Sequence, residues 1–259
     1  MNKHGKLLEV QDIQKNYGKK NNITKALKGV SFDILPGEFL GIMGPSGSGK
    51  TTLLNCIATI IKPTSGRVLL NGKNISAFDS KDLADYRGSR IGYLFQDFAL
   101  LDNLTGQENI LLPLSIHGVD FAKAQTKLNE LAGFLEIKDV LDKFPAQMSG
   151  GQKQRVAAAR SLISDPDIVL ADEPTGALDT RSAKMLMNKL EEIHKNSKRT
   201  ILMVSHDPNA TSFCSRILFI QDGVIFHELR RKHDESQEKF YERILQLLAQ
   251  LGGGSANVL

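Results

Sequence analysis

Tryptophan is absent from the 259 residues, and cysteine occurs only twice, as Cys56 and Cys214. Two cysteines so far apart provide neither a disulfide framework nor the paired spacing of a zinc site, so both are expected to be reduced and buried in a cytosolic protein. Long apolar runs are missing too: the longest surrounds residues 53–61, whereas a membrane-spanning helix needs about 20 residues. The opening MNKHGKLLEVQD has no apolar signal segment. Any membrane role is therefore expected to depend on a partner protein.

A large excess of either charge is also lacking. The chain carries 33 Lys and Arg against 29 Asp and Glu, and a net charge of +4 is too small to indicate a nucleic-acid partner. Hydrophobic residues make up 41% and charged residues 24%, as in ordinary globular proteins. The length suits one α/β domain, or one such domain with an appendage.

Short apolar segments alternate with helical patterns along the chain. The predicted strands lie at residues 7–13, 30–34, 38–43, 67–72 and 91–96, with a polar hairpin loop at 19–25. Apolar residues at three- and four-residue spacing predict helices between residues 100 and 144, and further helices follow at 149–163 and 179–195. The strands DIVLADEP and TILMVSHD, and a hairpin turning at Asp222-Gly223, complete the alternation.

A glycine-rich segment follows the strand at 38–43 and opens a helix. It fits the pattern G-x-x-x-x-G-K-[ST] completely, and such loops point backbone N–H groups at phosphate oxygens. The lysine reaches the β- and γ-phosphates, the next hydroxyl ligates Mg²⁺, and the helix N-terminus adds partial positive charge. The strand-loop-helix context disfavours a glycine-rich turn that binds nothing, but kinases, GTPases and ABC ATPases all carry this loop. The residues predicted to bind nucleotide here are Gly44, Pro45, Ser46, Gly47, Ser48, Gly49, Lys50, Thr51 and Thr52.

Two acids end the apolar strand at 168–171. Asp172 is positioned to organise Mg²⁺, directly or through water, and Glu173 to polarise an attacking water. The alternative is a solvated pair of surface acids, which the apolar run before them disfavours.

The segment Met148-Ser149-Gly150-Gly151-Gln152 distinguishes among P-loop proteins. A serine N-cap followed by two glycines exposes helix N–H groups to an anion. The segment resembles the signature of ABC-type ATPases, whose usual form is Leu-Ser-Gly-Gly-Gln, with methionine in place of leucine. The resemblance implies that Ser149, Gly150, Gly151 and Gln152 contact the γ-phosphate of an ATP held by a second subunit.

The other elements of this family follow in the expected order, over about residues 7–228. Tyr17 resembles the aromatic residue that stacks on adenine, although an isolated tyrosine there is also explained by packing. Gln96 resembles the Q-loop glutamine, Asp179 lies in a segment that resembles the D-loop between subunits, and His206 resembles the switch histidine near the γ-phosphate. The resemblance thus implies ATP and Mg²⁺ as cofactors, with Thr51, Gln96 and Asp172 around the metal and Glu173 and His206 as the catalytic pair.

The resemblance also implies the architecture. The expected α/β fold is an ABC-type P-loop ATPase domain at 1–228, with a RecA-like core, an antiparallel β subdomain and an α-helical subdomain at about 98–164. An extension at 229–259 is predicted to be a helical tail with a flexible end, GGGSANVL. Its apolar residues share one helical face, which either packs on the domain or contacts a partner or a membrane surface; they are Phe240, Ile244, Leu247, Leu248 and Leu251.

Finer likeness narrows the branch. The segments FQDFALLDNLTGQENILLPLSIHG and ADEPTGALD resemble the branch of macrolide exporters, lipoprotein-release ATPases and cell-division ATPases. Within it, Leu54-Asn55, Ile60, Gln96-Asp97-Phe98 and the segment HDPNATSFCSRILFIQDG most resemble Bce-type transporters for resistance to bacitracin and other antimicrobial peptides. Lipoprotein release and division control remain alternatives. A soluble, non-transport ABC protein would usually carry two cassettes or a long coiled coil, and the chain shows neither.

The Bce-type resemblance implies particular partners. Two copies of the chain would serve one integral-membrane permease, a large one with an extracellular domain, at the cytoplasmic face of the cell membrane. A sensor histidine kinase is often attached to such permeases, and no nucleic acid is expected.

Overall fold

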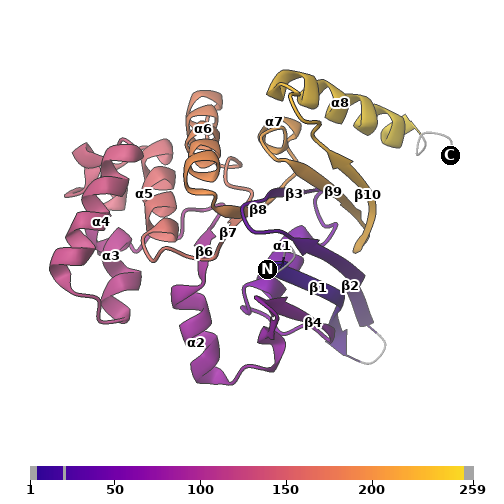
Figure 1. The fold of residues 1–259 in the computed structure, drawn as a ribbon, viewed down its shortest axis with the longest axis horizontal. Coiled ribbons are helices and arrows are strands. Elements are labelled where there is room, and N and C mark those ends of the chain that lie inside the picture. The colour runs from indigo at the N-terminus through magenta and orange to yellow at the C-terminus, as the bar shows by residue number, and fades with distance from the viewer. Residues whose placement is uncertain (1–4, 20–21, 254–259) are drawn as a thin grey trace.

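The computed structural model describes residues 5–19 and 22–253, and two sheets organise them (Figure 1). The larger sheet has the strand order β10-β9-β3-β8-β7-β6, in which only β10 runs antiparallel to its neighbour. These strands span, in that order, Val224–Arg230, Arg216–Gln221, Phe39–Met43, Thr200–Ser205, Ile168–Asp172 and Ile91–Leu94. Because β3, β7 and β8 are covered on both faces, each is a continuous buried run, as the sequence indicated for β7.

The smaller sheet is antiparallel, with the order β2-β1-β4-β5. Its strands are β1 (Leu8–Lys19), β2 (Asn22–Ile34), β4 (Ser65–Leu70) and β5 (Lys73–Asn74). The hairpin loop predicted at 19–25 is wrong in extent, because β2 already begins at Asn22. Lys and Asn have low strand propensity, but the β1–β2 ladder continues through Tyr17↔Thr24 to Lys19↔Asn22, and this pairing outweighs local preference.

Eight α-helices lie among the described residues, and all but the last lie between strands of the chain. They are α1 (Lys50–Ile57), α2 (Ser80–Ser89), α3 (Gly106–Ile116), α4 (Phe121–Phe134), α5 (Gly150–Leu162), α6 (Thr180–Ser197), α7 (Pro208–Thr211) and α8 (Gln237–Gly253). Short 3-10 turns lie at Ile75–Ala77, Lys138–Val140 and Pro145–Gln147. The helical pattern predicted between residues 100 and 163 is confirmed as α3, α4 and α5, which stand together at the left of Figure 1.

Helix α2 was missed by the sequence reading. Its only buried residue is Tyr86, so it has no apolar stripe from which a helical period could be recognised. The local signal is its N-cap, where the Asp79 carboxylate accepts a hydrogen bond from the Asp82 N–H at 2.8 Å.

The hydrophobic core has two parts, one on each face of the larger sheet. Alternate residues of β7 contribute to both parts. Val169 and Ala171 join the part that packs against the helical arm, the group formed by α3, α4 and α5. Ile168 and Leu170 join the part shared with α1 and the smaller sheet. The two cysteines divide in the same way, Cys214 in the first part and Cys56 in the second. Both are buried and free, as the sequence predicted.

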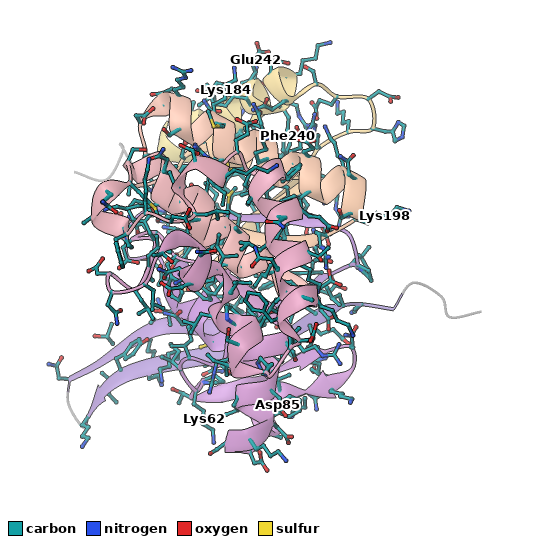
Figure 2. All side chains as sticks on the ribbon, turned by 90° about the vertical axis from the view of Figure 1, so that its left-hand side faces the viewer. Lys62, Asp85, Lys184, Lys198, Phe240 and Glu242 are labelled. Carbon is teal, nitrogen blue, oxygen red and sulfur yellow. The ribbon has the colours of Figure 1, made fainter. Side chains whose placement is uncertain are left out.

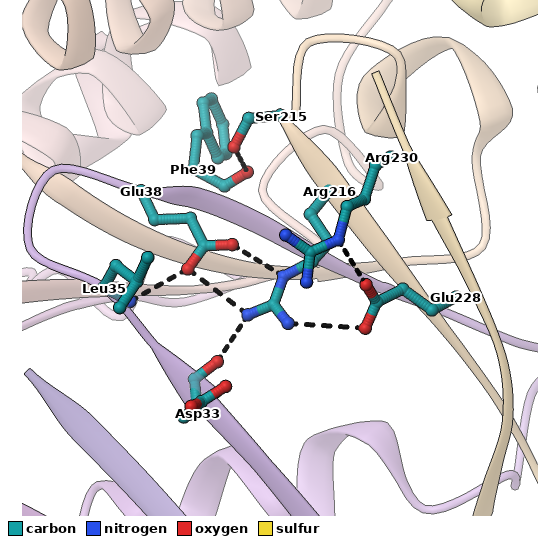
Figure 3. A network of polar contacts seen from close by, with 8 residues as sticks. All are labelled: Asp33, Leu35, Glu38, Phe39, Ser215, Arg216, Glu228 and Arg230. Carbon is teal, nitrogen blue, oxygen red and sulfur yellow. Dashed lines mark hydrogen bonds and ion pairs between the residues drawn. The ribbon is translucent and has the colours of Figure 1, made fainter. Parts of the chain in front are cut away.

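A buried arginine joins the two sheets (Figure 3). Arg216 of β9 donates from Nε to the Glu38 carboxylate at 2.6 Å and from Nη2 to the backbone oxygen of Asp33 in β2. Its Nη1 donates to Glu228 of β10 at 3.4 Å. A buried guanidinium needs such partners, and because Asp33 belongs to the smaller sheet and Glu228 to the larger one, the network ties the two sheets together.

The C-terminal tail is a helix packed on the domain. Phe240 and Ile244 of α8 are fully buried, and Leu247 and Leu248 pack against the same part of the core, as the packing alternative required. Figure 2 shows Phe240 on the inner side of the tail and Glu242 at the outer edge of the molecule. Of the predicted flexible end, the first two glycines continue α8, and residues 254–259 lie outside the described residues. Among residues 5–19 and 22–253, every helix is too short or too polar to serve as a membrane-spanning segment.

Candidate functional site

The carboxyl ends of the parallel strands carry most of the predicted site. The glycine-rich loop follows β3, His206 follows β8, Asp172 and Glu173 end β7, and Gln96 lies just beyond β6. Because these four strands are neighbours in the sheet, residues that are distant in the sequence meet along one edge. Ligands of open α/β sheets bind outside this edge.

The glycine-rich loop is shaped by two close approaches. A Cβ on Gly44 would lie 2.1 Å from the Ile220 oxygen, and one on Gly49 would lie 2.6 Å from the Ala26 oxygen, where φ is also +102°. Gly49 is the N-cap of α1 and supplies no side-chain acceptor, so the first-turn N–H groups are left for another acceptor. The buried Ser48 hydroxyl likewise has no hydrogen-bond partner among the described residues. The loop thus collects hydrogen-bond donors at a helix N-terminus, which is the chemistry of an anion site.

Lys50 is held inside this loop. Its side chain is 4% exposed, and Nζ donates to the backbone oxygens of Gly44 at 2.9 Å and Pro45 at 3.0 Å. The same ammonium lies 3.5 Å from Glu173 Oε1. The lysine and the second acid of the strand-end pair therefore form one charged unit.

Asp172 is fixed by two hydroxyl groups. Thr51 Oγ1 donates to Asp172 Oδ1 at 3.0 Å, and the Tyr93 hydroxyl contacts Oδ2 at 3.3 Å and Asn55 Oδ1 at 2.9 Å. Burial raises the pKa of Asp172, and the hydrogen bonds from Thr51 and Tyr93 oppose that rise. Burial, together with the Asp172 charge, raises the pKa of Tyr93. Asp172 and Glu173 are therefore not a solvated pair of surface acids. The sequence reading missed Tyr93 and Asn55, for which the available signal was a tyrosine in an otherwise apolar strand.

Glu173 and His206 form a second pair. His206 Nδ1 lies 2.7 Å from Glu173 Oε2, and the imidazole is 58% exposed. The Glu173 backbone has φ +43°, an unfavourable conformation for a residue with a Cβ, and its N–H donates to the Val204 oxygen at 2.9 Å. Backbone strain of this kind is concentrated at functional sites, where surrounding contacts maintain it.

Gln96 and Tyr17 are the remaining residues that the sequence predicted for the same chain's share of the site. Gln96 is exposed, and a Cβ on Gly176 would lie 3.1 Å from its Nε2, so its amide borders the turn that follows Glu173. Tyr17 lies on β1 with 43% of its surface exposed, and Lys15 Nζ is 5.1 Å from the ring centroid. The ring is therefore not packed in the core, which removes the packing explanation for this tyrosine.

The signature segment lies on the helical arm. Ser149 caps α5 with a reciprocal capping box: its Oγ accepts from the Gln152 N–H at 3.3 Å, and Gln152 Oε1 accepts from the Ser149 N–H at 2.9 Å. A Cβ on Gly151 would lie 2.6 Å from Ser182 Oγ, so α5 begins against the first turn of α6. Asp179 is the N-cap of α6, and its hydrogen bonds from Ser182 lower its pKa. Within the described chain, no hydrogen bond joins the signature to residues 44–51.

Comparison with known proteins assigns the family. The profile described as "ABC transporter" matches residues 27–176. The chain belongs to the ABC transporter family. The bacitracin export ATP-binding protein BceA of Halalkalibacterium halodurans is 46% identical over 95% of this chain and 97% of its own length. The macrolide export ATP-binding/permease protein MacB of Hyphomonas neptunium is 39% identical over 90% of this chain, but over only 36% of its own length.

A solved structure agrees with this assignment. The ATP-binding cassette MJ0796 of Methanocaldococcus jannaschii, in a dimeric post-hydrolysis state bound to ADP and Pi, has a TM-score of 0.81. The sequences are 36% identical, and the match covers 87% of this chain and 99% of that one. The expected ABC-type α/β fold is confirmed, as is the resemblance to the Bce-type and macrolide-exporter branch. The chain is an ABC-type ATPase, a transporter subunit that binds and hydrolyses ATP.

The ABC ATPase site has the donor set that Mg²⁺ requires. Mg²⁺ prefers oxygen ligands and keeps several waters, so one carboxylate and one hydroxyl beside the phosphates suffice. Asp172 and Thr51 provide these two oxygens in direct contact, and the Gln96 amide lies at the same sheet edge. In the part of the chain that the structure describes, no three His, Cys, Asp or Glu side chains gather to hold a metal by themselves. The residues therefore fit a metal shared with a nucleotide and not a metal caged by protein alone.

Proposed function

We propose that this ABC ATPase works with a second copy of itself at the cytoplasmic face of the cell membrane and drives an integral-membrane permease for resistance to antimicrobial peptides. The observation that carries the paired arrangement is that, within the described part of one chain, no hydrogen bond joins the signature to the phosphate loop. Supporting it, the similar cassette MJ0796 is described as dimeric. Supporting the transport role, the similar protein BceA is described as a bacitracin export ATP-binding protein.

Nucleotide binding uses the loop after β3. The first-turn N–H groups of α1 and the free Ser48 hydroxyl bind phosphate oxygens, and Lys50 neutralises the β- and γ-phosphates. Lys50 now donates to two loop carbonyls and contacts Glu173, so the arriving phosphate exchanges with some of these partners. Tyr17 stacks on adenine through its exposed ring. Thr51, Gln96 and Asp172 would hold Mg²⁺, which would neutralise charge on the phosphate oxygens.

Hydrolysis uses the Glu173–His206 pair. Once Lys50 turns to the phosphates, Glu173 orients or deprotonates the attacking water, because its carboxylate lies beside the phosphate loop. His206 holds that carboxylate at 2.7 Å and stabilises charge on the transferred phosphate. Catalysis is mostly positioning and charge stabilisation.

The second copy completes each site. Its Ser149, Gly150, Gly151 and Gln152 contact the γ-phosphate, and its Asp179 lies at the crossing between subunits. Closure of the pair draws together the segments that follow Gln96, and these segments pull on the permease. Since Asp179 and Ser182 lie against the signature within one chain, both contact regions move as a unit.

The substrates proposed are antimicrobial peptides such as bacitracin and lantibiotics, or their lipid-linked cell-wall targets. The permease partner is a large one with an extracellular domain, and a sensor histidine kinase attaches through it. The bacitracin assignment is supported by the 46% identity with BceA over nearly the whole chain. The permease and the kinase are proposed from the Bce-type resemblance of the sequence.

The test is gentle solubilisation of native membranes followed by purification of the tagged chain. A large permease of about ten spanning segments, with or without a histidine kinase, is expected to copurify, and the Lys50→Ala strain is expected to lose bacitracin resistance while retaining the complex. A strain with the untagged chain is the control. Recovery of a small four-span permease would overturn the peptide assignment in favour of lipoprotein release or division control.

A further inference from the structure

The five residues around Gln96 adopt a backbone that needs outside support. Strand β6 ends at Leu94, and the chain then turns so that Phe98 has φ +67° and Ala99 has φ +46°. Both residues carry a Cβ, which makes two successive left-handed conformations unfavourable. Such a segment keeps its shape only where neighbouring groups hold it.

Arg160 of α5 holds the segment on the C-terminal side of Gln96. Its Nη2 donates to the Phe98 oxygen at 2.8 Å and its Nη1 to the Ala99 oxygen at 2.6 Å. Burial lowers the pKa of this guanidinium, and among the described residues no carboxylate lies within ion-pair distance of it. The two carbonyls are therefore the groups that its planar pair of donors serves.

Gln154 of the same helix holds the segment on the N-terminal side of Gln96. This side chain is fully buried, and its Nε2 donates to the Phe95 oxygen at 3.2 Å and to the Pro174 oxygen at 2.8 Å. Phe95 immediately precedes Gln96, and Pro174 immediately follows Glu173. One amide therefore ties the signature helix to the start of the Gln96 segment and to the strand end that carries the acids.

The two side chains bracket Gln96 from one rigid element. Helix α5 begins at the signature, and a Cβ on Gly150 would lie 3.8 Å from Phe98 Cζ, so its first turn also borders the segment. We propose that Gln154 and Arg160 are positioning residues that make the segment 95–99 move with the signature helix as one body. The inference deepens the proposed function, because its effect on turnover rests on the role given there to Gln96.

The consequence is a coupling between the two halves of the paired site. A phosphate of the ATP held by the second copy binds at the N-terminus of α5 and reorients that helix. The bracket, formed by the contacts of Gln154 and Arg160 with the segment 95–99, transmits this movement to Gln96, which serves the ATP of its own chain. Without the contacts from Gln154 and Arg160, Gln96 samples several positions and would hold Mg²⁺ less well together with Thr51 and Asp172.

The direct test is amide hydrogen exchange of the full chain. Arg160→Lys keeps the charge but removes the planar pair of donors, and Gln154→Leu keeps the volume but removes the amide. Both are expected to speed exchange in residues 95–101 on the order of tenfold. The matched control is Arg155→Lys, the same change on the same helix, where Nη1 contacts Met185 Sδ on α6 instead of this segment. Unchanged exchange in both variants, with the fold intact, would overturn the inference.

A second measurement separates this inference from the role of Gln96. In ATPase assays, Arg160→Lys is expected to raise the Mg²⁺ concentration for half-maximal activity about tenfold, with little change in the KM for ATP at saturating Mg²⁺. Combined with Gln96→Ala, it is expected to add no further loss, whereas additive losses would mean that Arg160 acts elsewhere. If exchange increases but Gln96→Ala leaves the Mg²⁺ dependence unchanged, the bracket stands and the proposed role of Gln96 fails.

Discussion

Two helices of this ABC ATPase have glycine at their N-termini, Gly49 before α1 and Gly150 and Gly151 at the start of α5, and these N-termini are capped in opposite ways. Helix α1 has Gly49 as its N-cap and no side-chain acceptor for its first-turn N–H groups. Helix α5 has Ser149 as its N-cap and a complete capping box with Gln152. Gly49 is half-buried at the edge of the sheet, while Ser149 is exposed at the start of α5.

The difference shows how a shared chemistry is divided between roles. An uncapped N-terminus carries unsatisfied donors that a phosphate can take up, so α1 is built to be completed by its ligand. A capped N-terminus is stable without a ligand and keeps its partial positive charge. The N-terminus of α5 can therefore remain exposed to solvent until it binds a phosphate held by another chain. Substitutions at four positions test this division, beginning with the largest expected effect.

Glu173→Gln removes the carboxylate that α1's site needs for water activation. Turnover is expected to fall about 10²- to 10⁴-fold, since a positioned general base contributes about that much. ATP binding should persist, and a closed dimer should accumulate with ATP in size-exclusion chromatography. Hydrolysis at the wild-type rate would show that Glu173 is not the base.

Lys50→Ala removes the cation inside the uncapped end. Loss of one preorganised charge donor at a reacting phosphate is expected to lower turnover by about 10²- to 10³-fold. Fluorescent-nucleotide titration should show weakened ATP binding as well. The control is Lys62→Ala, a change at an exposed lysine that Figure 2 shows at the far edge of the molecule. Wild-type affinity in Lys50→Ala would remove this residue from the phosphate site.

Ser149 distinguishes capping from anion recognition at the second end. Ser149→Ala is expected to cost about 1 kcal/mol of stability through loss of the cap, whereas Ser149→Asp keeps an equivalent cap. The aspartate variant should melt like the wild type but hydrolyse ATP about 10- to 100-fold more slowly, because its charge repels phosphate where the hydroxyl would bind it. Normal turnover in Ser149→Asp would leave Ser149 with a capping role alone.

Asp172→Asn is expected to give the smallest change, in stability. Burial raises the folded-state pKa of Asp172, so the proton binds more tightly in the folded chain than in the unfolded chain. The resulting stability is present below the unfolded-state pKa and is lost as the pH rises through the folded-state pKa. The neutral amide avoids that loss, so its melting temperature should exceed the wild type's by a few degrees at neutral pH and by less in acid. An equal difference at both pH values would contradict the role of charge burial.

Local features of the sequence predicted much of this. The cap at Ser149, the buried strand ending at Asp172 and the turn at Asp222-Gly223 are confirmed, because each depends on a few adjacent residues. The apolar face of the tail was also recognised by its helical period, and only the structure showed that the domain covers it. The roles of the site residues toward ATP stay predictions.

Features that depend on distant residues were not predictable. Tyr93 reaches Asp172 only because β6 lies beside β7, and Asn55 of α1 contacts the same Tyr93 hydroxyl only because α1 lies close to that edge of the sheet. Gln154 and Arg160 are ordinary polar positions of an amphipathic helix until the fold brings the Gln96 segment against them.

By itself, the sequence determined the phosphate loop, the acid pair and the signature, since glycine spacing, capping residues and strand-end acids act through local backbone geometry. The tertiary structure alone decided which of them share one site. Parallel strand order brings Lys50, Asp172, Glu173 and His206 to a single edge, while Ser149 starts α5, where no hydrogen bond joins it to that chain's own loop among the described residues. The physical reason is that strand pairing and core packing are long-range interactions, whose outcome no short segment encodes.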